Sequence, residues 1–182
     1  MMIRKLPVTE LDRLTPDEYR AAVKTPLVVV LDNVRSMHNI GSVFRTCDAF
    51  RAEAVYLCGI SSTPPHAEIH KSALGAEDTV AWRYFDDTVA AVEALKADGY
   101  RVFAVELAEG SIQLPALRLS GIDKVAVVLG HEVKGVQQAV IDRCQGCIEI
   151  PQLGTKHSLN VSVTGGIIIW EIFKQLSDGL ER

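Results

Sequence analysis

Three short segments carry polar residues whose types and spacing could do chemistry. They are NVRSMHNIGSVFR (33–45), LGHEVKG (129–135) and IPQLGTKHSLNVS (150–162). The first places Arg45 in an apolar stretch, where a guanidinium could face an anion with its planar fork of donors. The second sets Glu132 between two glycines, which let a backbone approach a ligand closely. The third crowds Ser158 and Asn160 together, which is more polar capacity than one helix start requires.

Each of these residues also has an ordinary structural explanation, and one motif alone does not decide between the two. Asn39 could cap a helix, Arg45 could be a solvated charge, and Glu132 could lie on a tight turn. The charge distribution favours a functional role for the first segment. The chain has a net charge of -4, yet residues 35–51 hold three arginines against Asp48 alone. An acidic protein needs such a local basic patch if it binds nucleic acid.

Alternating strands and helices must position these segments. Continuous apolar runs predict strands buried on both faces at Thr25–Val34, Ala52–Gly59, Tyr100–Leu107, Asp123–Gly130 and Gly146–Pro151. Helical spacing is found at Asn39–Phe50 and Asp86–Gly99, and TPDE (15–18) has the capping-box signature of a short helix. The pattern predicts an α/β domain with a mostly parallel sheet and helices on both faces. Ligands of such sheets bind at the carboxyl ends of the strands, where the three segments lie.

Several classes of protein are excluded by motifs that the sequence lacks. It contains no GxGxxG, GxxxxGK[ST] or G-x-S-x-G motif. No apolar run approaches the ~20 residues of a membrane span, and the charged N-terminus has no signal core, so we expect a cytoplasmic protein without membrane contact. Cys144 and Cys147 form CQGC without a second ligand pair, so we expect no metal and interpret the cysteines as small thiols in a reducing compartment.

In their order along the chain, the motifs N-x-G-x-x-x-R, G-x-E-x-x-G and S-L-N-V-S resemble those of the SpoU/TrmH family of RNA ribose methyltransferases, in the SPOUT superfamily. The matching residues are Asn39, Gly41, Arg45, Gly130, Glu132, Gly135, Ile150, Pro151, Gly154, Ser158, Leu159, Asn160, Val161 and Ser162. The resemblance covers about residues 27–176. It implies a catalytic domain over 27–182 with a C-terminal trefoil knot, preceded by a short helical extension over 1–26. Gln152 and Thr164 depart from the common Met and Ala of the family, which could alter the pocket lining.

The resemblance implies S-adenosyl-L-methionine as the cofactor, held by the loops at 105–109, 130–135 and 150–159. Its expected binding residues are Val105, Glu106, Leu107, Gly130, Ile150, Ser158 and Leu159. A side chain at Gly130 is expected to fill the space of the ligand, so that a Gly130→Val variant folds but loses the cofactor. Arg45 matches the catalytic arginine of the family. The residues expected to orient Arg45, the ribose and the RNA are Ser158, Asn160, Asn39 and Glu132.

The expected reaction explains why an arginine would be needed. A ribose 2′-hydroxyl is a weak nucleophile at neutral pH, so the protein must orient it and stabilise the developing alkoxide. Because an arginine stays protonated, we expect Arg45 to stabilise that charge directly or through the adjacent phosphate. The expected substrate is tRNA or, alternatively, rRNA. A catalytically inactive RNA-binding member of the same fold is one other possibility, and a different α/β enzyme with a nucleotide cofactor is another.

The RNA surface and the assembly are also expectations of the resemblance. The candidate RNA contacts are Arg35, Arg45, Lys71, Lys134 and Lys156. The family dimerises through helices next to the knot, so we expect a homodimer that uses two helices, Asn39–Phe50 and the apolar helix ending in IIIWEIFKQL (167–176). The second of these helices has more apolar residues than one buried face requires. The residues concerned are Ile167, Trp170, Ile172 and Phe173.

Overall fold

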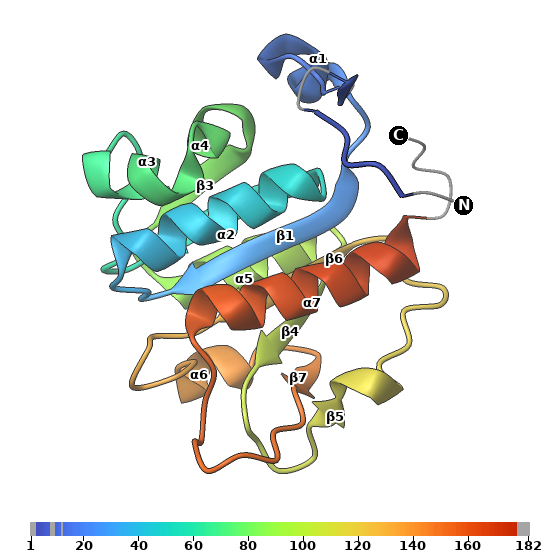
Figure 1. The fold of residues 1–182 in the computed structure, drawn as a ribbon. Helices are drawn as coiled ribbons and strands as arrows, with labels where there is room; N and C mark the ends of the chain where they lie inside the picture. The colour runs from blue at the N-terminus through green and yellow to red at the C-terminus, as the bar shows by residue number, and fades with distance from the viewer. Residues whose placement is uncertain (1–2, 8–9, 12, 178–182) are drawn as a thin grey trace.

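A seven-stranded parallel sheet forms the centre of the fold (Figure 1). The computed structural model describes residues 3–7, 10, 11 and 13–177. In that part of the chain the strand order is β3-β2-β1-β6-β4-β7-β5, and every neighbouring pair is parallel. The strands are β1 (Thr25–Asp32), β2 (Ala52–Cys58), β3 (Ala81–Phe85), β4 (Arg101–Val105), β5 (Ile112–Gln113), β6 (Val125–Leu129) and β7 (Gly146–Glu149).

Helices cover both faces of this sheet, which confirms the predicted α/β class. Strand β1 shows why two layers are needed. Leu27, Val29 and Leu31 face one apolar core, Val28 and Val30 face the other, and none of the five is more than 1% exposed. The first layer holds α2 (Met37–Ala49), α3 (Ala67–Ala73), α4 (Ala76–Thr79) and α7 (Val161–Leu176), and the second holds α5 (Thr88–Ala97) and α6 (Gln138–Ile141).

The five strands and four helices expected from the sequence are confirmed, and the ends that were predicted lie within about two residues of the observed ones, as is usual at element ends. The sequence did not predict β3, β5, α3, α4 or α6. Strand β3 lies at the sheet edge and none of its side chains is buried, so it lacks the apolar run of a central strand. Strand β5 has two residues, and α4 and α6 have four each, which leaves no room for a periodic pattern.

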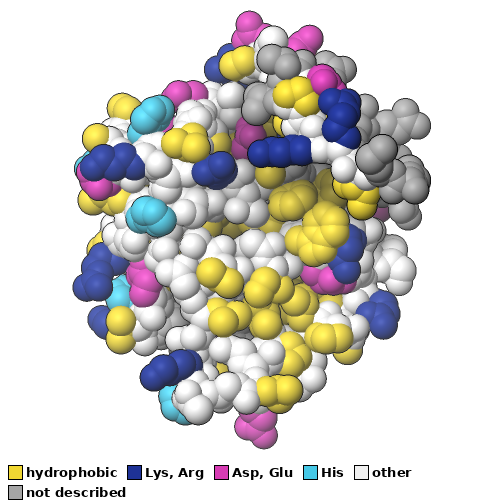
Figure 2. All heavy atoms as spheres, viewed as in Figure 1, with side chains coloured by type: hydrophobic (Ala, Val, Ile, Leu, Met, Phe, Trp, Pro, Cys, Tyr) yellow, Lys and Arg dark blue, Asp and Glu magenta, His cyan; other side chains and the backbone are white. Residues whose placement is uncertain are grey.

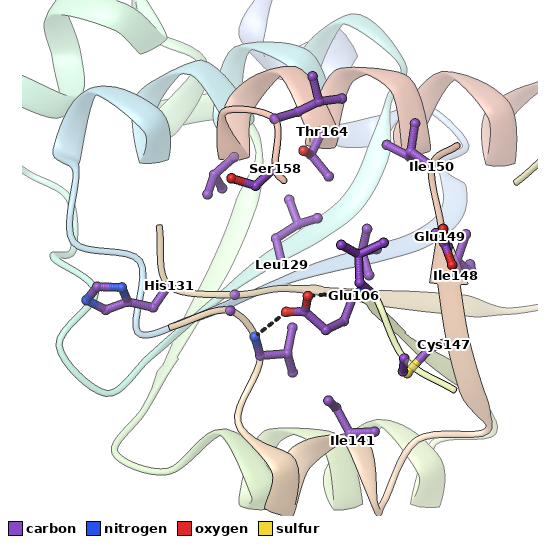
Figure 3. A pocket seen from close by; sticks show the side chains of 18 of the residues that line it. Glu106, Leu129, His131, Ile141, Cys147, Ile148, Glu149, Ile150, Ser158 and Thr164 are labelled. Atoms are coloured by element: carbon purple, nitrogen blue, oxygen red, sulfur yellow. Dashed lines mark hydrogen bonds between the residues drawn. The ribbon is translucent and has the colours of Figure 1, made fainter. Parts of the chain in front are cut away.

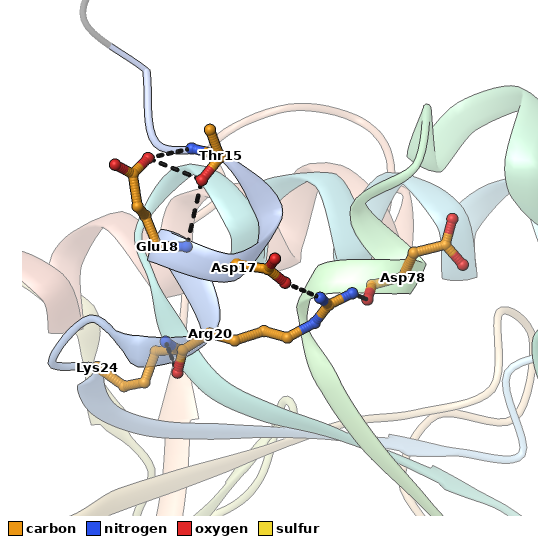
Figure 4. Close-up of polar contacts among 6 residues, drawn as sticks. All are labelled: Thr15, Asp17, Glu18, Arg20, Lys24 and Asp78. Carbon is orange, nitrogen blue, oxygen red and sulfur yellow. Dashed lines mark hydrogen bonds and ion pairs between the residues drawn. The ribbon is translucent and has the colours of Figure 1, made fainter.

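The predicted N-terminal helix is present as α1 (Pro16–Ala21), and its capping box is confirmed (Figure 4). The hydroxyl of Thr15 accepts a hydrogen bond from the Glu18 N–H at 3.3 Å, and the Glu18 carboxylate accepts one from the Thr15 N–H at 2.7 Å. Arg20 donates to the carbonyl of Asp78 at 3.1 Å and so attaches α1 to α4. The domain boundary at residue 26 stays an expectation.

Helix α7 brings the third motif back to the first. It packs beside α2 over β1 and β6 (Figure 1). Gly165 permits this close approach, because a Cβ there would lie 3.1 Å from the Leu129 side chain and 3.5 Å from that of Val43. The trefoil knot stays a prediction of the family resemblance. Within the described residues, no helix is long and apolar enough to cross a membrane.

Candidate cofactor and RNA site

A cavity of about 840 Å³ lies at the carboxyl ends of β4, β6 and β7 (Figure 3). Such a volume is typical of a site for a small molecule. Four stretches of chain line it, at 105–110, 129–141, 146–152 and 157–164. They include all seven residues predicted to bind the cofactor, and Gln152 and Thr164 lie in the lining as well. The loops after the three strands therefore converge where the sequence placed the cofactor.

The lining is divided between an apolar floor and a charged rim. Leu129, Ile148 and Ile150 contribute side chains to the floor (Figure 3). The rim carries acidic and basic groups, among them Glu106, Glu132, Lys134, His131 and His157. An apolar floor suits a flat nucleoside base, and polar groups around it could fix orientation.

The carboxylate of Glu132 connects the loop after β6 to the start of α2. It accepts hydrogen bonds from the N–H groups of Arg35 at 3.1 Å and Ser36 at 2.8 Å, and from the side-chain amide of Asn39 at 3.0 Å. Burial alone would raise the pKa of Glu132. Hydrogen bonds from its own backbone, from Ser36 and Arg35 and from Asn39 nevertheless lower that pKa below its ordinary value. Glu132 is therefore held as an anion at neutral pH.

Asn39 continues this connection to the third motif. Its side-chain oxygen accepts a hydrogen bond from the Asn160 amide at 3.1 Å. Asn160 in turn caps α7, because its oxygen accepts from the N–H of Ser162 at 2.8 Å and from its hydroxyl at 2.6 Å. The alternative that Asn39 caps α2 is wrong, since the cap is Ser36. The three motifs are thus joined side chain to side chain, in the order Glu132, Asn39, Asn160.

Arg45 lies apart from the cavity. It lines a second groove, of about 510 Å³, between α2 and α3. Arg45 is exposed and has no hydrogen bond or ion pair with any other described residue. The groove is also lined by His38, Ser42, Thr46, Ala49, Phe50, Lys71 and Ser72. The structure therefore does not bring Arg45 into contact with Ser158 or Asn160 within one chain.

The candidate RNA contacts are spread over both hollows. Lys71 shares the groove with Arg45 and forms an exposed ion pair with Glu68 at 2.6 Å. Lys134 lines the cavity. Arg35 and Lys156 are exposed, and Arg35 uses only its backbone N–H in the contact with Glu132. Three of the five candidates thus line a hollow, Arg45 and Lys71 the groove and Lys134 the cavity, and Arg35 and Lys156 line neither.

The two loops that flank the cavity differ in their support. We name residues 130–137 the anchored loop and residues 151–159 the open segment. In the anchored loop, His131 and Gly135 exchange backbone hydrogen bonds at 2.8 and 3.1 Å. In the open segment, no residue makes a hydrogen bond with any other described residue, and all side chains except Gln152 are exposed. Ser158 and Leu159 belong to this segment, so the structure places them at the cavity without fixing them.

The expectation for Gly130 needs correction. A Cβ at this position would overlap the backbone of Gly135 and Val136, which close the anchored loop. A Gly130→Val variant would therefore disturb the loop itself. The predicted reason, that the side chain would fill the space of the ligand, is wrong, because the chain's own backbone takes up that space. The glycine is required by the close approach of two backbone segments of the same chain.

Two acidic side chains that support the anchored loop were missed by the sequence reasoning. Asp32, fully buried at the end of β1, accepts from the backbone N–H of Gln137 at 2.9 Å and from its side-chain amide at 2.8 Å. It also accepts from the Thr88 hydroxyl at 2.6 Å. The side chain of Glu106, for which no role was predicted, accepts a hydrogen bond from the N–H of Val136 at 2.9 Å. The sequence does contain a signal for both residues, because each is a single acid at the end of an apolar strand.

The two cysteines of CQGC are free thiols in the structure, Cys144 half-buried and Cys147 buried. Burial raises the pKa of Cys144 to about 12 and also raises the pKa of Cys147, so both stay protonated at neutral pH. Among the described residues, no group of three or more His, Cys, Asp or Glu side chains could hold a metal ion.

Solved structures of known proteins share this fold. The chain matches the A. aeolicus TrmH/SpoU tRNA modifying enzyme with a TM-score of 0.77 and 26% identity, over 90% of this chain and 83% of that one. It matches the AdoMet-bound rRNA methyltransferase from Sinorhizobium meliloti with a TM-score of 0.78 and 26% identity, over 90% of this chain and 62% of that one. The fold and the cavity at its strand ends thus define the class as RNA methyltransferases that use S-adenosylmethionine.

The sequence of the whole domain gives the family. The model of the SpoU rRNA Methylase family matches residues 26–170. The 23S rRNA (guanosine-2′-O-)-methyltransferase RlmB of Vibrio cholerae is 31% identical over 175 residues, which are 96% of this chain and 70% of that protein. The protein of the same name from Nitrosomonas europaea is 33% identical over 93% of this chain and 65% of its own length. The chain belongs to the SpoU rRNA Methylase family.

Membership of this family confirms the predicted enzyme class. The chain is an S-adenosylmethionine-dependent RNA methyltransferase that acts on a ribose 2′-hydroxyl. The comparisons do not favour the alternative of an inactive RNA-binding protein.

Proposed function

We propose that this enzyme methylates ribosomal RNA, with the cofactor in the cavity and Arg45 at the reacting ribose. The names of the curated relatives support ribosomal RNA, since those from Vibrio cholerae and Nitrosomonas europaea are both called 23S rRNA (guanosine-2′-O-)-methyltransferases. A tRNA substrate is the second candidate, because the A. aeolicus structure is described as a tRNA modifying enzyme. We also propose a cytoplasmic location, because the substrate named for the curated relatives is an intracellular RNA.

The observation that carries the proposal is the hydrogen-bonded chain from Glu132 through Asn39 to Asn160. It runs from the rim of the cavity to the start of two helices, and its members come from three motifs far apart in sequence. Polar side chains that hold one another in this way could position a substrate without reorganising during the reaction. If these three side chains served only the fold, the cap that Asn160 provides for α7 would be sufficient.

The cavity residues fit S-adenosylmethionine. The apolar floor at Leu129, Ile148 and Ile150 suits the adenine, and the backbone of 105–107 and 130–135 offers polar groups at its rim. When bound, the cofactor supplies an activated methyl group that needs only an in-line nucleophile. The task of the protein is then to orient the ribose and to stabilise the oxygen that loses its proton. We assign the stabilisation of that oxygen to Arg45 and the orientation of the ribose to Asn39 and Asn160.

A homodimer would explain why Arg45 lies outside the cavity of its own chain. The residues Val163, Ile167 and Trp170 of α7 are apolar and exposed. Figure 2 shows an apolar surface over this helix. Trp170 also contacts Phe50 at the end of α2, with ring centroids 5.5 Å apart. The prediction that Ile172 contributes to this face is wrong, because its side chain is fully buried in the core. We propose that a second copy covers this face and brings its cavity toward Arg45.

The dimer is tested by light scattering. We expect a particle of twice the 19.9 kDa chain mass at micromolar concentration. Trp170→Glu should reduce it to the monomer, because a charge would be buried in the interface. The matched control is Ile60→Glu, which changes an exposed apolar residue elsewhere on the surface and should leave the mass unchanged. A wild-type monomer would overturn the dimer proposal.

The RNA substrate is tested by methyl transfer from labelled S-adenosylmethionine to purified 23S rRNA, 16S rRNA and tRNA in parallel. A 2′-O-methyl group blocks alkaline cleavage at the next phosphodiester bond, so the label should be recovered in alkali-stable dinucleotides of 23S rRNA. Label in tRNA alone would replace rRNA by tRNA as the substrate. Label that alkali releases in mononucleotides would indicate base methylation and contradict the assigned chemistry.

A further inference from the structure

The side chain of Glu106 lies between β4 and the anchored loop. Its Oε1 atom accepts a hydrogen bond from the N–H of Leu107 at 2.9 Å, and Oε2 accepts one from the N–H of Val136 at 2.9 Å (Figure 3). Both donors belong to backbone that lines the cavity. We propose that Glu106 is a positioning residue for cofactor binding, which holds the anchored loop in the shape that forms one side of the cavity. The proposal rests on the cofactor site given above.

Gly135 adds a second, independent constraint at the same place. Its φ of +67° is a left-handed conformation that other residues rarely adopt. In addition, a Cβ on Gly135 would overlap the Oε2 atom of Glu106. The carboxylate therefore occupies the space that the missing side chain leaves open. The glycine and the acid fit each other as a pair across the end of the sheet.

The contact between Glu106 and Val136 controls the position of the anchored loop, because the next residue, Gln137, is already held in place. Asp32 holds Gln137 from the buried end of β1. Gly135 is paired with His131 through two backbone hydrogen bonds, so the position of Val136 determines that of residues 131–135. Without the carboxylate, the N–H of Val136 would lose its acceptor, and the loop would lose the contact that holds it against the end of β4 at the cavity wall.

A different role for Glu106 would be electrostatic attraction of the positively charged sulfonium of the cofactor. S-adenosylhomocysteine lacks this charge but has the same adenosine and amino-acid parts. A loop of the wrong shape weakens both ligands alike, whereas a lost charge weakens S-adenosylmethionine more. The comparison of the two ligands therefore separates positioning from direct charge attraction.

The first experiment measures both dissociation constants for Glu106→Gln by calorimetry. Glutamine keeps the size but offers one acceptor oxygen, and its NH₂ group faces one of the two N–H donors. We expect both constants to rise roughly tenfold, which corresponds to about 1.4 kcal/mol, with turnover at saturating cofactor and the melting temperature nearly unchanged. The matched control is Glu93→Gln, which removes the same charge outside the cavity lining, where the carboxylate pairs with Lys96 and Arg143, and which should leave both constants unchanged.

The second experiment is a double-mutant cycle with Glu106→Ala and Gly135→Ala. The backbone strain of Gly135→Ala is the same in both backgrounds and cancels, so that only the interaction between the two positions remains. We expect Gly135→Ala to weaken the cofactor less in the Glu106→Ala background, where the space of the carboxylate is free.

Three results would overturn the inference. They are wild-type affinity in Glu106→Gln, a loss confined to S-adenosylmethionine, and strictly additive effects in the cycle. A wild-type protein that binds neither ligand would instead overturn the cofactor site itself, so the two failures can be told apart.

Discussion

The anchored loop and the open segment border the same cavity, yet they are built in opposite ways. Three carboxylates fix the anchored loop: Asp32 through Gln137, Glu106 through Val136, and its own Glu132 through the start of α2. The open segment, residues 151–159, has no hydrogen bond to any other described residue. One side of the cavity is therefore formed before a ligand binds, and the other side is left to adapt.

This difference suggests how the enzyme divides its binding energy. A preformed loop loses little conformational freedom when the cofactor binds, whereas ordering a free segment costs about 1–2 kcal/mol per residue in backbone entropy alone. That cost makes sense if the segment is ordered only when the cofactor, the RNA or a second subunit contacts it. We therefore expect affinity for the cofactor to depend on the anchored loop and the response to substrate to depend on the open segment.

The largest expected effect comes from Arg45, which lies outside both the anchored loop and the open segment. Its substitution tests whether methyl transfer can be lost while cofactor binding, which we assign to these two regions, is kept. We expect Arg45→Ala to lower single-turnover methyl transfer by ~10²–10³, the usual cost of removing one preorganised charge donor. Cofactor affinity should stay unchanged. Arg45→Lys should not restore the rate, because a lysine presents a point charge in place of a planar fork.

The control for Arg45 is Lys71→Ala in the same groove. It should raise the KM for RNA with little change in turnover. Wild-type turnover in Arg45→Lys would leave Arg45 as one basic contact among several.

The next largest effect is expected from a comparison of the same glycine-to-alanine substitution in the two regions. We expect Gly130→Ala to lower the free energy of unfolding by about 1–3 kcal/mol and to weaken cofactor binding, because its Cβ would overlap the backbone of Gly135 and Val136. Gly154→Ala in the open segment meets nothing within 4 Å and should change stability by less than about 1 kcal/mol. Urea unfolding and calorimetry measure both quantities. Equal losses at the two glycines would contradict the difference between the regions.

A smaller effect is expected from the titration of Glu132. Its pKa is lowered in the folded protein from an ordinary value of 4.5, so its ionised form stabilises the fold above that pH. This contribution should be lost as the pH falls below 4.5 through the lowered pKa. At neutral pH we expect Glu132→Gln to be less stable than wild type by about 1 kcal/mol, and the gap should close in acid. A gap that stays constant with pH would show that the carboxylate charge does not hold the loop to α2.

The sequence predicted those parts of the molecule that depend on periodicity and on family motifs. Strand β1 could be recognised because its run of apolar residues is buried from both sides, and the cavity because three loops with motif residues follow parallel strands. The contacts that shape the site could not be predicted in this way. The bond between Asn39 and Asn160 joins residues 121 positions apart.

The roles of Asp32 and Glu106 were hidden for a related reason. Each is a single acid at the end of an apolar strand, and its partners, Gln137 and Val136, belong to a loop that reaches it only in the folded protein. For Arg45, in contrast, the residue could be predicted but its surroundings could not. The motif identified the residue, but only the structure places it in a groove apart from the cavity.

The most direct test of the difference between the two regions is amide hydrogen exchange with and without S-adenosylmethionine. We expect the amides of the anchored loop, 130–137, to be protected already in the free enzyme and to change little on binding. The amides of the open segment should exchange quickly in the free enzyme and become protected when the cofactor, followed by RNA, is added. Rapid exchange of residues 130–137 in the free enzyme, or an open segment that no ligand protects, would contradict a cavity with one preformed side and one adaptable side.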